Sequence, residues 1–438
     1  MKKFLTIIAA VLLSVSCSTD EEKGSGGYQP SGDPIRFEAT TGGAFTRAVT
    51  GEIGEIGDDT SLRGLTFESH PSGGEGLRGF GVFAAYTGPL KYENTTVSAD
   101  FMYNQQVKWN ATASPAAWEY NPVKYWPNET NDYVSFFAYA PYEPSPDDDG
   151  RCIIDISKNT DFGDPWVNYR LSKDPWGTDG NAATEPQVDL MYAFQRTGDS
   201  EPYGAAKWYD QTKNAGAGIG YDERLMFTFN HALGCFAHEI TLQLNDELRT
   251  KLNGYATITI NSFNITYNNL TNKARLILNP EISGTNAYAN WKEIISGELT
   301  VSRTTGNIDK YPTYDGENYL NGDNTTTALS FDLTKTATDD PAKKISEDRG
   351  LLYIPIIIAG QPKPTVTVTI NYTITNNAST SYNGSVSKDI DLSDYHLETY
   401  QGKKIGLALT LTKDLDLAHL VYTLDSTPAT EPSYIRKH

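Results

Sequence analysis

Residues 365–374 read TVTVTINYTI, and this stretch indicates the fold class most clearly. Threonine or asparagine alternates there with apolar residues, namely Val366, Val368, Ile370, Tyr372 and Ile374. Successive side chains of a β-strand point to opposite faces of a sheet. The period of two therefore predicts a strand with one face in a core and the other in water.

The same alternation of apolar and polar residues recurs at 225–231, 236–244 and 405–411. Asn-Gly pairs, which are typical of tight turns between strands, stand at 253–254, 321–322 and 383–384. Helical periodicity is scarce, and 286–295 is the one stretch for which we expect a short helix. The pattern as a whole predicts an all-β chain built of antiparallel sandwiches.

The composition is that of a globular chain. It has 438 residues, of which 38% are hydrophobic and 21% charged. This length suits two sandwiches, and a loop rich in Gly, Asp, Lys and Ala at 198–220 suggests where they divide. We expect an N-terminal β-sandwich at 34–222 and a C-terminal one at 223–438. The formal net charge of −19 argues against nucleic acid as a charge-driven partner.

The start of the chain is typical of a secretory signal. Lys2 and Lys3 precede an apolar run at 4–15, whereas a membrane-spanning helix needs about 20 apolar residues. Because this run ends just before Cys17, residues 1–16 resemble a bacterial lipoprotein signal peptide, with Cys17 as the lipidated residue. The alternative is a plain secretory signal followed by an incidental cysteine.

The residues after Cys17 predict a flexible tether over 17–33, which is polar and rich in Gly and Ser. The acidic run at 20–22 resembles the surface-export signal of Bacteroidetes lipoproteins, and its alternative is a solvated linker. Two or more acyl chains would hold the protein on a membrane. We therefore expect an outer-membrane lipoprotein that is exported to the cell surface.

Motifs for catalysis are missing from the sequence. His238-Glu239 is not followed by the second histidine of a metalloprotease helix. His231, Cys235 and His238 fit no usual zinc spacing, and we favour histidines at a strand end or core edge. The acidic turn at 147–149 lacks the spacing of an EF-hand loop. We expect no enzyme, no catalytic residues, no metal and no cofactor.

Aromatic residues crowd one segment, with Trp109, Trp118, Tyr120, Tyr125, Trp126, Tyr133, Phe136, Phe137, Tyr139 and Tyr142. If exposed they would stack on sugar rings, and if buried they would fill a sandwich core. We favour the core, because Phe137 and Tyr139 share a strand phase opposite to that of Phe136.

Two further cysteines, Cys152 and Cys235, are too few for a disulfide framework. Cys235 lies among apolar residues, which suits a buried thiol. The sequence leaves open whether the two cysteines pair.

Several short motifs follow one another along the chain. They are GVFAAY at 81–86, WEY at 118–120, YWP at 125–127, VSFFAYAP at 134–141, DLMYA at 189–193, FNHAL at 229–233, YIP at 353–355 and GKK at 402–404. Together and in this order they resemble the fimbrillin family of Bacteroidales. The resemblance implies two transthyretin-like antiparallel β-sandwich domains in tandem. It also implies a pilus subunit that is made as a lipoprotein precursor.

In fimbrillins a surface protease specific for arginine removes the lipidated N-terminal segment. The resemblance places that cut after Arg47 and before Ala48, where small and polar residues give a protease access. The alternative is an ordinary exposed arginine in a turn. If the segment with Ile35, Phe37 and Ala39 completes a sandwich, the cut lets it leave and opens a hydrophobic groove.

An extended strand from another chain could fill such a groove. The donor candidate is the C-terminal segment in which Leu415, Leu417 and Val421 share one face. The alternative is that this segment is the last strand of its own sandwich. Repeated head-to-tail insertion does not close on itself, so it would produce a filament.

The function that these patterns favour is a structural subunit of a cell-surface fimbria that supports adhesion and biofilm formation. Its expected partners are other pilin subunits, in a homo- or heteropolymer, and host or bacterial surface receptors. The alternative is a lipid-anchored protein that binds a glycan or a host protein, or a tip or anchor adhesin of a pilus.

Overall fold

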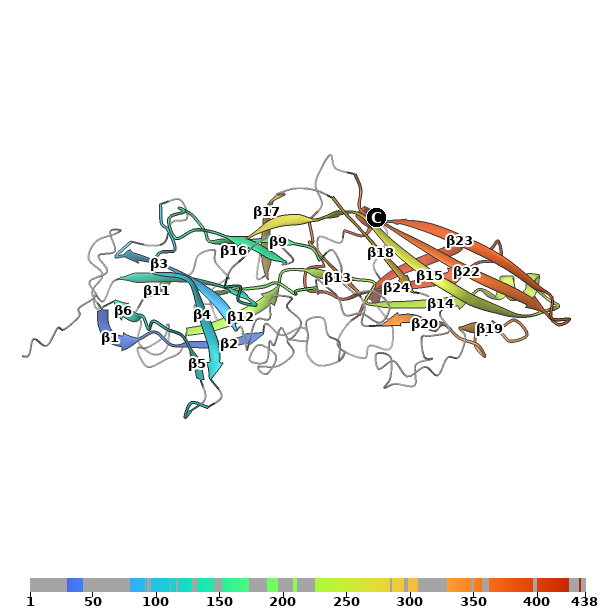
Figure 1. Ribbon diagram of the computed structural model, residues 1–438, viewed down its shortest axis with the longest axis horizontal. Helices are drawn as coiled ribbons and strands as arrows, with labels where there is room; N and C mark the ends of the chain where they lie inside the picture. Colours follow the sequence, from blue (N-terminus) through green and yellow to red (C-terminus); the bar gives the residue numbers. More distant parts are fainter. Residues whose placement is uncertain are drawn as a thin grey trace, which may run out of the picture.

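The computed structural model describes residues 30–41, 79–90, 92, 96–110, 112–115, 117–127, 132–144, 146, 152–172, 187–195, 208–210, 225–283, 286–294, 298–305, 329–347, 350–356, 362–396, 400–424 and 433–434. The molecule is elongated, with the earlier strands at one end and the later strands at the other (Figure 1). Almost every described element is a β-strand, so the all-β prediction is confirmed.

The largest sheet is eight-stranded, with seven strands in the order β2-β12-β10-β7-β3-β4-β5 and β11 paired with β7. These strands are β2 (Phe37–Thr41), β3 (Phe80–Gly88), β4 (Met102–Asn110), β5 (Ala117–Glu119), β7 (Tyr133–Ala140), β10 (Met191–Gln195), β11 (Trp208–Asp210) and β12 (Leu225–His231). A separate two-stranded sheet joins β1 (Pro30–Pro34) to β6 (Tyr125–Pro127).

Both faces of the eight-stranded sheet carry buried side chains. Phe136 and Ala138 lie in one hydrophobic cluster with Phe80. Phe137 and Tyr139 lie in a second cluster, which continues into the C-terminal half of the chain. The prediction of an aromatic core on both sides of this strand is therefore confirmed for Phe136, Phe137 and Tyr139, whereas Tyr125, predicted in the same core, is 38% exposed.

A four-stranded sheet, in the order β17-β16-β9-β8, combines strands from both halves of the chain. Its members are β8 (Ile153–Ile156), β9 (Trp166–Arg170), β16 (Lys273–Ser283) and β17 (Asn286–Ile294). In Figure 1, β9, β16 and β17 lie between the two ends of the molecule. Moreover, β12 follows residue 222 but pairs with β10, which precedes it. Strand pairing thus does not follow the domain bounds 34–222 and 223–438, which stay a prediction.

Two five-stranded sheets make up the C-terminal end. One has the order β20-β14-β24-β25-β26, with β14 (Glu239–Leu244), β20 (Lys343–Glu347), β24 (Ile405–Leu411), β25 (Leu417–Thr423) and β26 (Ser433–Tyr434). The other has the order β18-β15-β22-β23 with β19 on β15, and contains β15 (Tyr255–Thr271), β18 (Glu298–Thr305), β19 (Ser330–Asp332), β22 (Thr365–Asn376) and β23 (Ser381–Asp391). A two-stranded sheet joins β13 (Gly234–Phe236) to β21 (Leu351–Tyr353).

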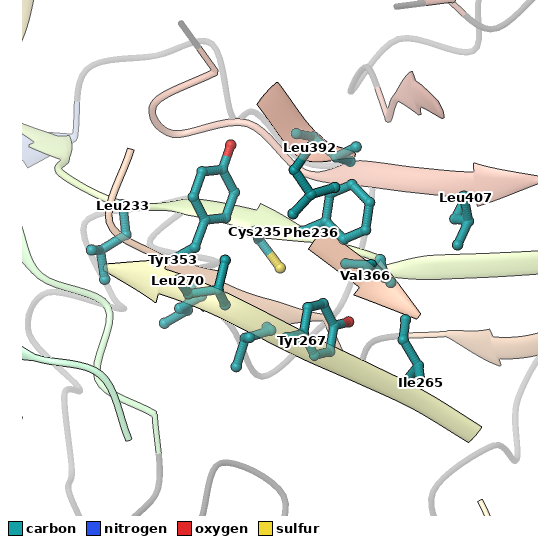
Figure 2. Packing of buried hydrophobic residues seen from close by; sticks show 14 of the residues in the cluster. Leu233, Cys235, Phe236, Ile265, Tyr267, Leu270, Tyr353, Val366, Leu392 and Leu407 are labelled. Carbon is teal, nitrogen blue, oxygen red and sulfur yellow. The ribbon is translucent and has the colours of Figure 1, made fainter. Parts of the chain in front are cut away.

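The two five-stranded sheets share one core. Leu407 of β24, Val366 of β22 and Tyr267 of β15 belong to the same cluster of buried residues. Figure 2 shows these side chains around Phe236, whose ring meets that of Tyr267 edge-on. Side chains from the inner faces of two sheets therefore fill one interior, which is the arrangement of a β-sandwich.

The short helix expected at 286–295 is wrong. This segment is β17, which pairs antiparallel with β16. Its Trp291 is buried, and the indole Nε1 donates a hydrogen bond to the Ala232 carbonyl at 2.9 Å. Pairing with β16 and burial of the large ring outweigh a weak helical period, because tertiary context overrides local propensity.

The described helices are short. The α-helix α2 (Asp246–Lys251) begins after Asn245, whose side chain accepts a hydrogen bond from the Leu248 amide at 3.0 Å. Such a cap satisfies an amide that has no partner inside the helix. The 3₁₀-helix η2 (Leu392–Tyr395) follows β23. Within the described residues, no helix combines the length and the apolar character that crossing a membrane requires.

Within the described strands, four glycines lie under the ring of the tyrosine that faces them in an antiparallel pair: Gly81–Tyr139, Gly234–Tyr353, Gly384–Tyr372 and Gly406–Tyr422. In each pair the tyrosine ring lies over the glycine: a Cβ built on Gly406 would stand 2.3 Å from Tyr422 Cζ. A ring that covers a glycine shields the backbone and packs where the glycine has no side chain. Glycine is thus required at these positions because a tyrosine ring lies where the Cβ of any other residue would stand.

Gly406→Ala should destabilise the protein by about 1–3 kcal/mol, because the new methyl group forces the Tyr422 ring out of place. Urea unfolding measures the change. In a Tyr422→Ala background the same substitution should cost much less, since the clash is gone. Equal costs in the two backgrounds would show that the ring does not constrain Gly406.

Candidate functional site

The site predicted around Ile35, Phe37 and Ala39 is a strand at the end of a sheet. β2 lies at the outer end of the eight-stranded sheet and pairs parallel with β12, from Phe37–Leu225 to Thr41–Phe229. Ile35, Phe37 and Ala39 are each 1% exposed. Ile35, Phe37 and Ala39 are therefore part of the core, although among the described strands of the sheet β2 pairs only with β12.

Backbone hydrogen bonds fix the chain just before β2. The Ile35 amide donates to the Lys124 carbonyl at 2.9 Å, and the Tyr120 hydroxyl donates to the Ile35 carbonyl at 2.8 Å. The Leu225 amide of β12 donates to the Arg36 carbonyl at 2.7 Å. Both polar backbone groups of Ile35 are thus satisfied inside the protein, as buried groups must be.

Four aromatic rings surround the side chain of Phe37. Phe227 stacks on it with ring centres 5.6 Å apart and an angle of 21°. Tyr120, Phe136 and Phe80 meet it tilted or edge-on, at 5.2, 6.1 and 6.4 Å. Stacked and edge-on aromatic pairs contribute about 0.5–1.5 kcal/mol each beyond area burial. We call this arrangement the Phe37 socket.

Removal of β2 would leave an apolar groove. Its floor would be the socket rings Phe80, Phe136 and Phe227 with the Tyr120 ring beside them. Its wall would be β12, whose backbone amides and carbonyls on that side would lose their partners. Unpaired strand edges and exposed apolar rings are both unfavourable in water. Such a groove favours any extended segment able to fill it.

The donor candidate at the C-terminal end is a strand of its own sheet. β25 pairs antiparallel with β24 from Leu417–Leu411 to Thr423–Ile405. Leu417 and Val421 are fully buried, and Leu415 lies in the turn before β25, half-buried against the same cluster. This cluster is distinct from the one around Phe37. The structure therefore does not bring the two candidate segments together.

His231 lies at the end of β12 and forms an ion pair with Asp189. Its Nδ1 is 2.6 Å from the Asp189 carboxylate. Burial lowers the pKa of His231, but the charge and hydrogen bond of Asp189 outweigh it, so the pKa is raised, with Lys404 opposing. His231 thus occupies a core edge, as expected. Among the described residues, no group of three or more His, Cys, Asp or Glu side chains could hold a metal ion.

Gln401 connects the N-terminal sheet to β17. Its side-chain Nε2 donates to the Tyr192 hydroxyl at 3.0 Å and to the His231 carbonyl at 2.7 Å. Its Oε1 accepts a hydrogen bond from the Ala289 amide at 2.6 Å. One amide side chain therefore bonds β10, the end of β12 and β17 together.

Cys152 and Cys235 are both buried, and they do not form a disulfide with each other. The question that the sequence left open is thereby answered. Cys235 Sγ lies 4.0 Å from His238 Nδ1 within the core. Three of the predicted site residues, Cys17, Arg47 and Ala48, lie outside the described residues, as does the acidic turn at 147–149.

Sequence reasoning missed the role of Tyr120. Its ring was expected in the core, but its hydroxyl also holds the Ile35 carbonyl, and Lys124 contributes through its backbone carbonyl. The WEY and YWP motifs flank this region, at 118–120 and 125–127. These motifs were the sequence signal for such a contact, because the hydroxyl of a tyrosine at the edge of a core usually needs a hydrogen-bond partner.

Comparison with known proteins adds to this geometry. A search against protein-family models finds no match. "Fimbrium subunit Fim1C" of Phocaeicola vulgatus is 30% identical over 95 residues, which are 21% of this chain. The matched part of the chain spans 24% of the length of that relative.

The structure also resembles that of a fimbrial protein from Bacteroides vulgatus ATCC 8482. The TM-score is 0.56 at 18% sequence identity, and the match covers 90% of this chain and 99% of the other. The chain has the fold of a fimbrial protein. The resemblance to fimbrillins predicted from the sequence motifs is thus confirmed.

In this fimbrial fold, the stability that the Asp189–His231 pair contributes should fall as pH rises. His231 has a raised pKa in the folded state, so its contribution is complete below its unfolded pKa of about 6.5 and is lost as pH passes the folded value. Urea unfolding of wild type and Asp189→Asn should show a larger difference at pH 6 than at pH 9.

Asp414→Asn is the matched control, because Asp414 pairs with Lys251 on the surface and no histidine takes part. Its effect should be small and equal at both pH values. A difference for Asp189→Asn that does not change with pH would contradict the assignment.

Proposed function

We propose that the chain is a structural subunit of a cell-surface fimbria whose β2 is exchanged for a strand of another subunit. The observation that carries the proposal is the position of β2, whose Phe37 and Ala39 are buried and which, among the described strands of the sheet, pairs only with β12. An end strand can leave without splitting a sheet, whereas a central strand cannot. The fimbrial fold and the partial match to Fim1C support the role.

The energetics of β2 favour exchange over simple loss. Burying a side chain such as that of Ile35 or Phe37 stabilises the folded state by about 1.5–3 kcal/mol. Loss of β2 forfeits this free energy and uncovers the β12 edge. An incoming strand recovers both contributions through side-chain packing and backbone hydrogen bonds. The groove therefore drives association only after β2 has gone.

Cleavage between Arg47 and Ala48 is the step that we propose releases β2. Before the cut, the segment that joins β2 to β3 keeps β2 near its groove at a high effective concentration. After the cut, residues 1–47 are held by noncovalent contacts alone. If Cys17 is lipidated, the same cut separates the subunit from its anchor in the outer membrane.

The burial of Leu417 and Val421 argues against β25 as the donated strand. Leu417 and Val421 would have to leave the β24 edge and their own core before they could enter a groove elsewhere. Each side chain would give up about as much burial as it gains. We therefore propose that the donor is a segment that is not already a strand of its own sandwich.

Arg47→Ala should keep the precursor uncut and monomeric, because β2 stays tethered in its groove. Mass spectrometry of the protein after treatment with an arginine-specific protease measures the cut, and electron microscopy of the same sample detects fibres. Arg63→Ala serves as a matched control that should still assemble. Fibres formed equally well by Arg47→Ala would refute processing at this position.

A reversible lock tests the exchange itself. Thr40 and Thr228 are register partners on β2 and β12, so Thr40→Cys combined with Thr228→Cys should form a disulfide between the two strands. The oxidised protein should be cut yet fail to assemble, and a reducing agent should restore fibres. Assembly that proceeds while the disulfide is intact would show that β2 need not leave.

A further inference from the structure

Resting on the proposed exchange, we infer that the groove selects its incoming strand by side-chain size. The strand must carry an aliphatic side chain, an aromatic side chain two residues later, and a small side chain two residues after that. β25 of a second copy does not satisfy this rule. The reasons lie in the three positions that Ile35, Phe37 and Ala39 occupy.

The central position requires a flat ring. Phe227 stacks on Phe37, while Phe80 and Phe136 meet it edge-on, so the Phe37 socket is a slot between rings. Leucine would fill part of this volume but would lose the stacking. Alanine would leave a cavity lined by rings that cannot collapse into it. The socket therefore discriminates between aromatic and aliphatic side chains.

The positions of Ile35 and Ala39, on either side of Phe37 along the strand, accept side chains of different sizes. Ala39 is 1% exposed, so the core is closed around its methyl group and a longer side chain would overpack it. Ile35, also 1% exposed, fills the other position with a branched aliphatic group. The groove thus accepts a strand that carries a large aliphatic, an aromatic and a small side chain at alternate residues.

The Tyr120 hydroxyl and the Lys124 carbonyl set the register through backbone groups of the strand, whereas the Tyr120 ring contacts Phe37. The Tyr120 hydroxyl and the Lys124 carbonyl bond the carbonyl and amide of Ile35, which lies two residues before the ring. Any residue except proline offers the same backbone amide and carbonyl there. Tyr120 is therefore a positioning residue: it fixes which side chain of the strand enters the socket.

β25 fails this rule in either direction. Its aromatic residue, Tyr422, has Leu420 two residues before it and Leu424 two residues after it, so a leucine would fall at the small position. A second segment of the chain, 65–69, reads LTFES and matches the pattern of IRFEA at 35–39. It lies outside the described residues, and its sequence supplies an independent test peptide.

Peptide binding to the full chain tests the inference. A recognition site for a sequence-specific protease is inserted after Arg47, the protein is cut, and labelled peptides compete with the retained residues 1–47. Fluorescence anisotropy gives the affinity of each peptide, and mass spectrometry gives the release of residues 1–47. The peptides are residues 34–41, the same peptide with Phe37→Leu, Phe37→Ala or Ala39→Leu, residues 64–70, and residues 415–424.

The peptides of residues 34–41 and 64–70 should bind. Phe37→Leu should weaken binding about tenfold, since stacking is lost, and Phe37→Ala by about a hundredfold or more, since a cavity is left. Ala39→Leu and residues 415–424 should bind at least about tenfold more weakly than residues 34–41. In protein carrying Tyr120→Phe, the wild-type and Phe37→Leu peptides should lose affinity by the same factor, because the hydroxyl bonds only backbone.

The inference would be overturned, with the exchange left intact, if the Phe37→Leu and Phe37→Ala peptides bound with equal affinity. It would also be overturned if residues 415–424 bound as tightly as residues 34–41. If residues 1–47 stay bound and even the 34–41 peptide fails to enter, the proposed function fails and the inference with it. Circular dichroism of Tyr120→Phe checks that the variant is folded, and unequal losses for the two peptides would remove Tyr120 from its positioning role.

Discussion

The stacking of Phe37 on Phe227 closes the N-terminal core. Phe227 belongs to β12, which in turn pairs with β10, so the ring contact joins β2 to the inner strands of the eight-stranded sheet. No second strand shares this task, because β2 lies at the end of the sheet. The core around Phe37 is thus completed by a strand at the end of the sheet, which β12 holds by backbone pairing and the surrounding rings hold by packing.

Local alternation made much of the fold predictable. The apolar residues of 365–374 are buried and their polar neighbours are half-buried or exposed, as expected for one strand face in a core. Ile35, Phe37 and Ala39 are likewise buried at every second position. These predictions succeeded because a period of two reflects the geometry of a single strand.

Predictions that depended on distant partners fared less well. The segment at 286–294 became a strand because β16 offers an edge and Ala232 a partner for Trp291. The alternation of β25 is the same whether the strand packs in its own sandwich or in another subunit. The pattern therefore left open whether β25 is an intrinsic strand or a donated one. The hydroxyl contact of Tyr120 with Ile35 spans 85 residues and leaves no trace in local spacing.

The arrangement of the long strands bears on how the molecule carries load. β15 and β22 are paired over nearly their whole length and run along the long axis of the molecule (Figure 1). Hydrogen bonds in an antiparallel pair stand perpendicular to the strands. Tension applied between the two ends therefore shears many bonds simultaneously, and they must break together. Resistance to pulling, unlike equilibrium stability, is set by the rate of that rupture, and this geometry slows the rupture when the force acts along the long axis of the molecule.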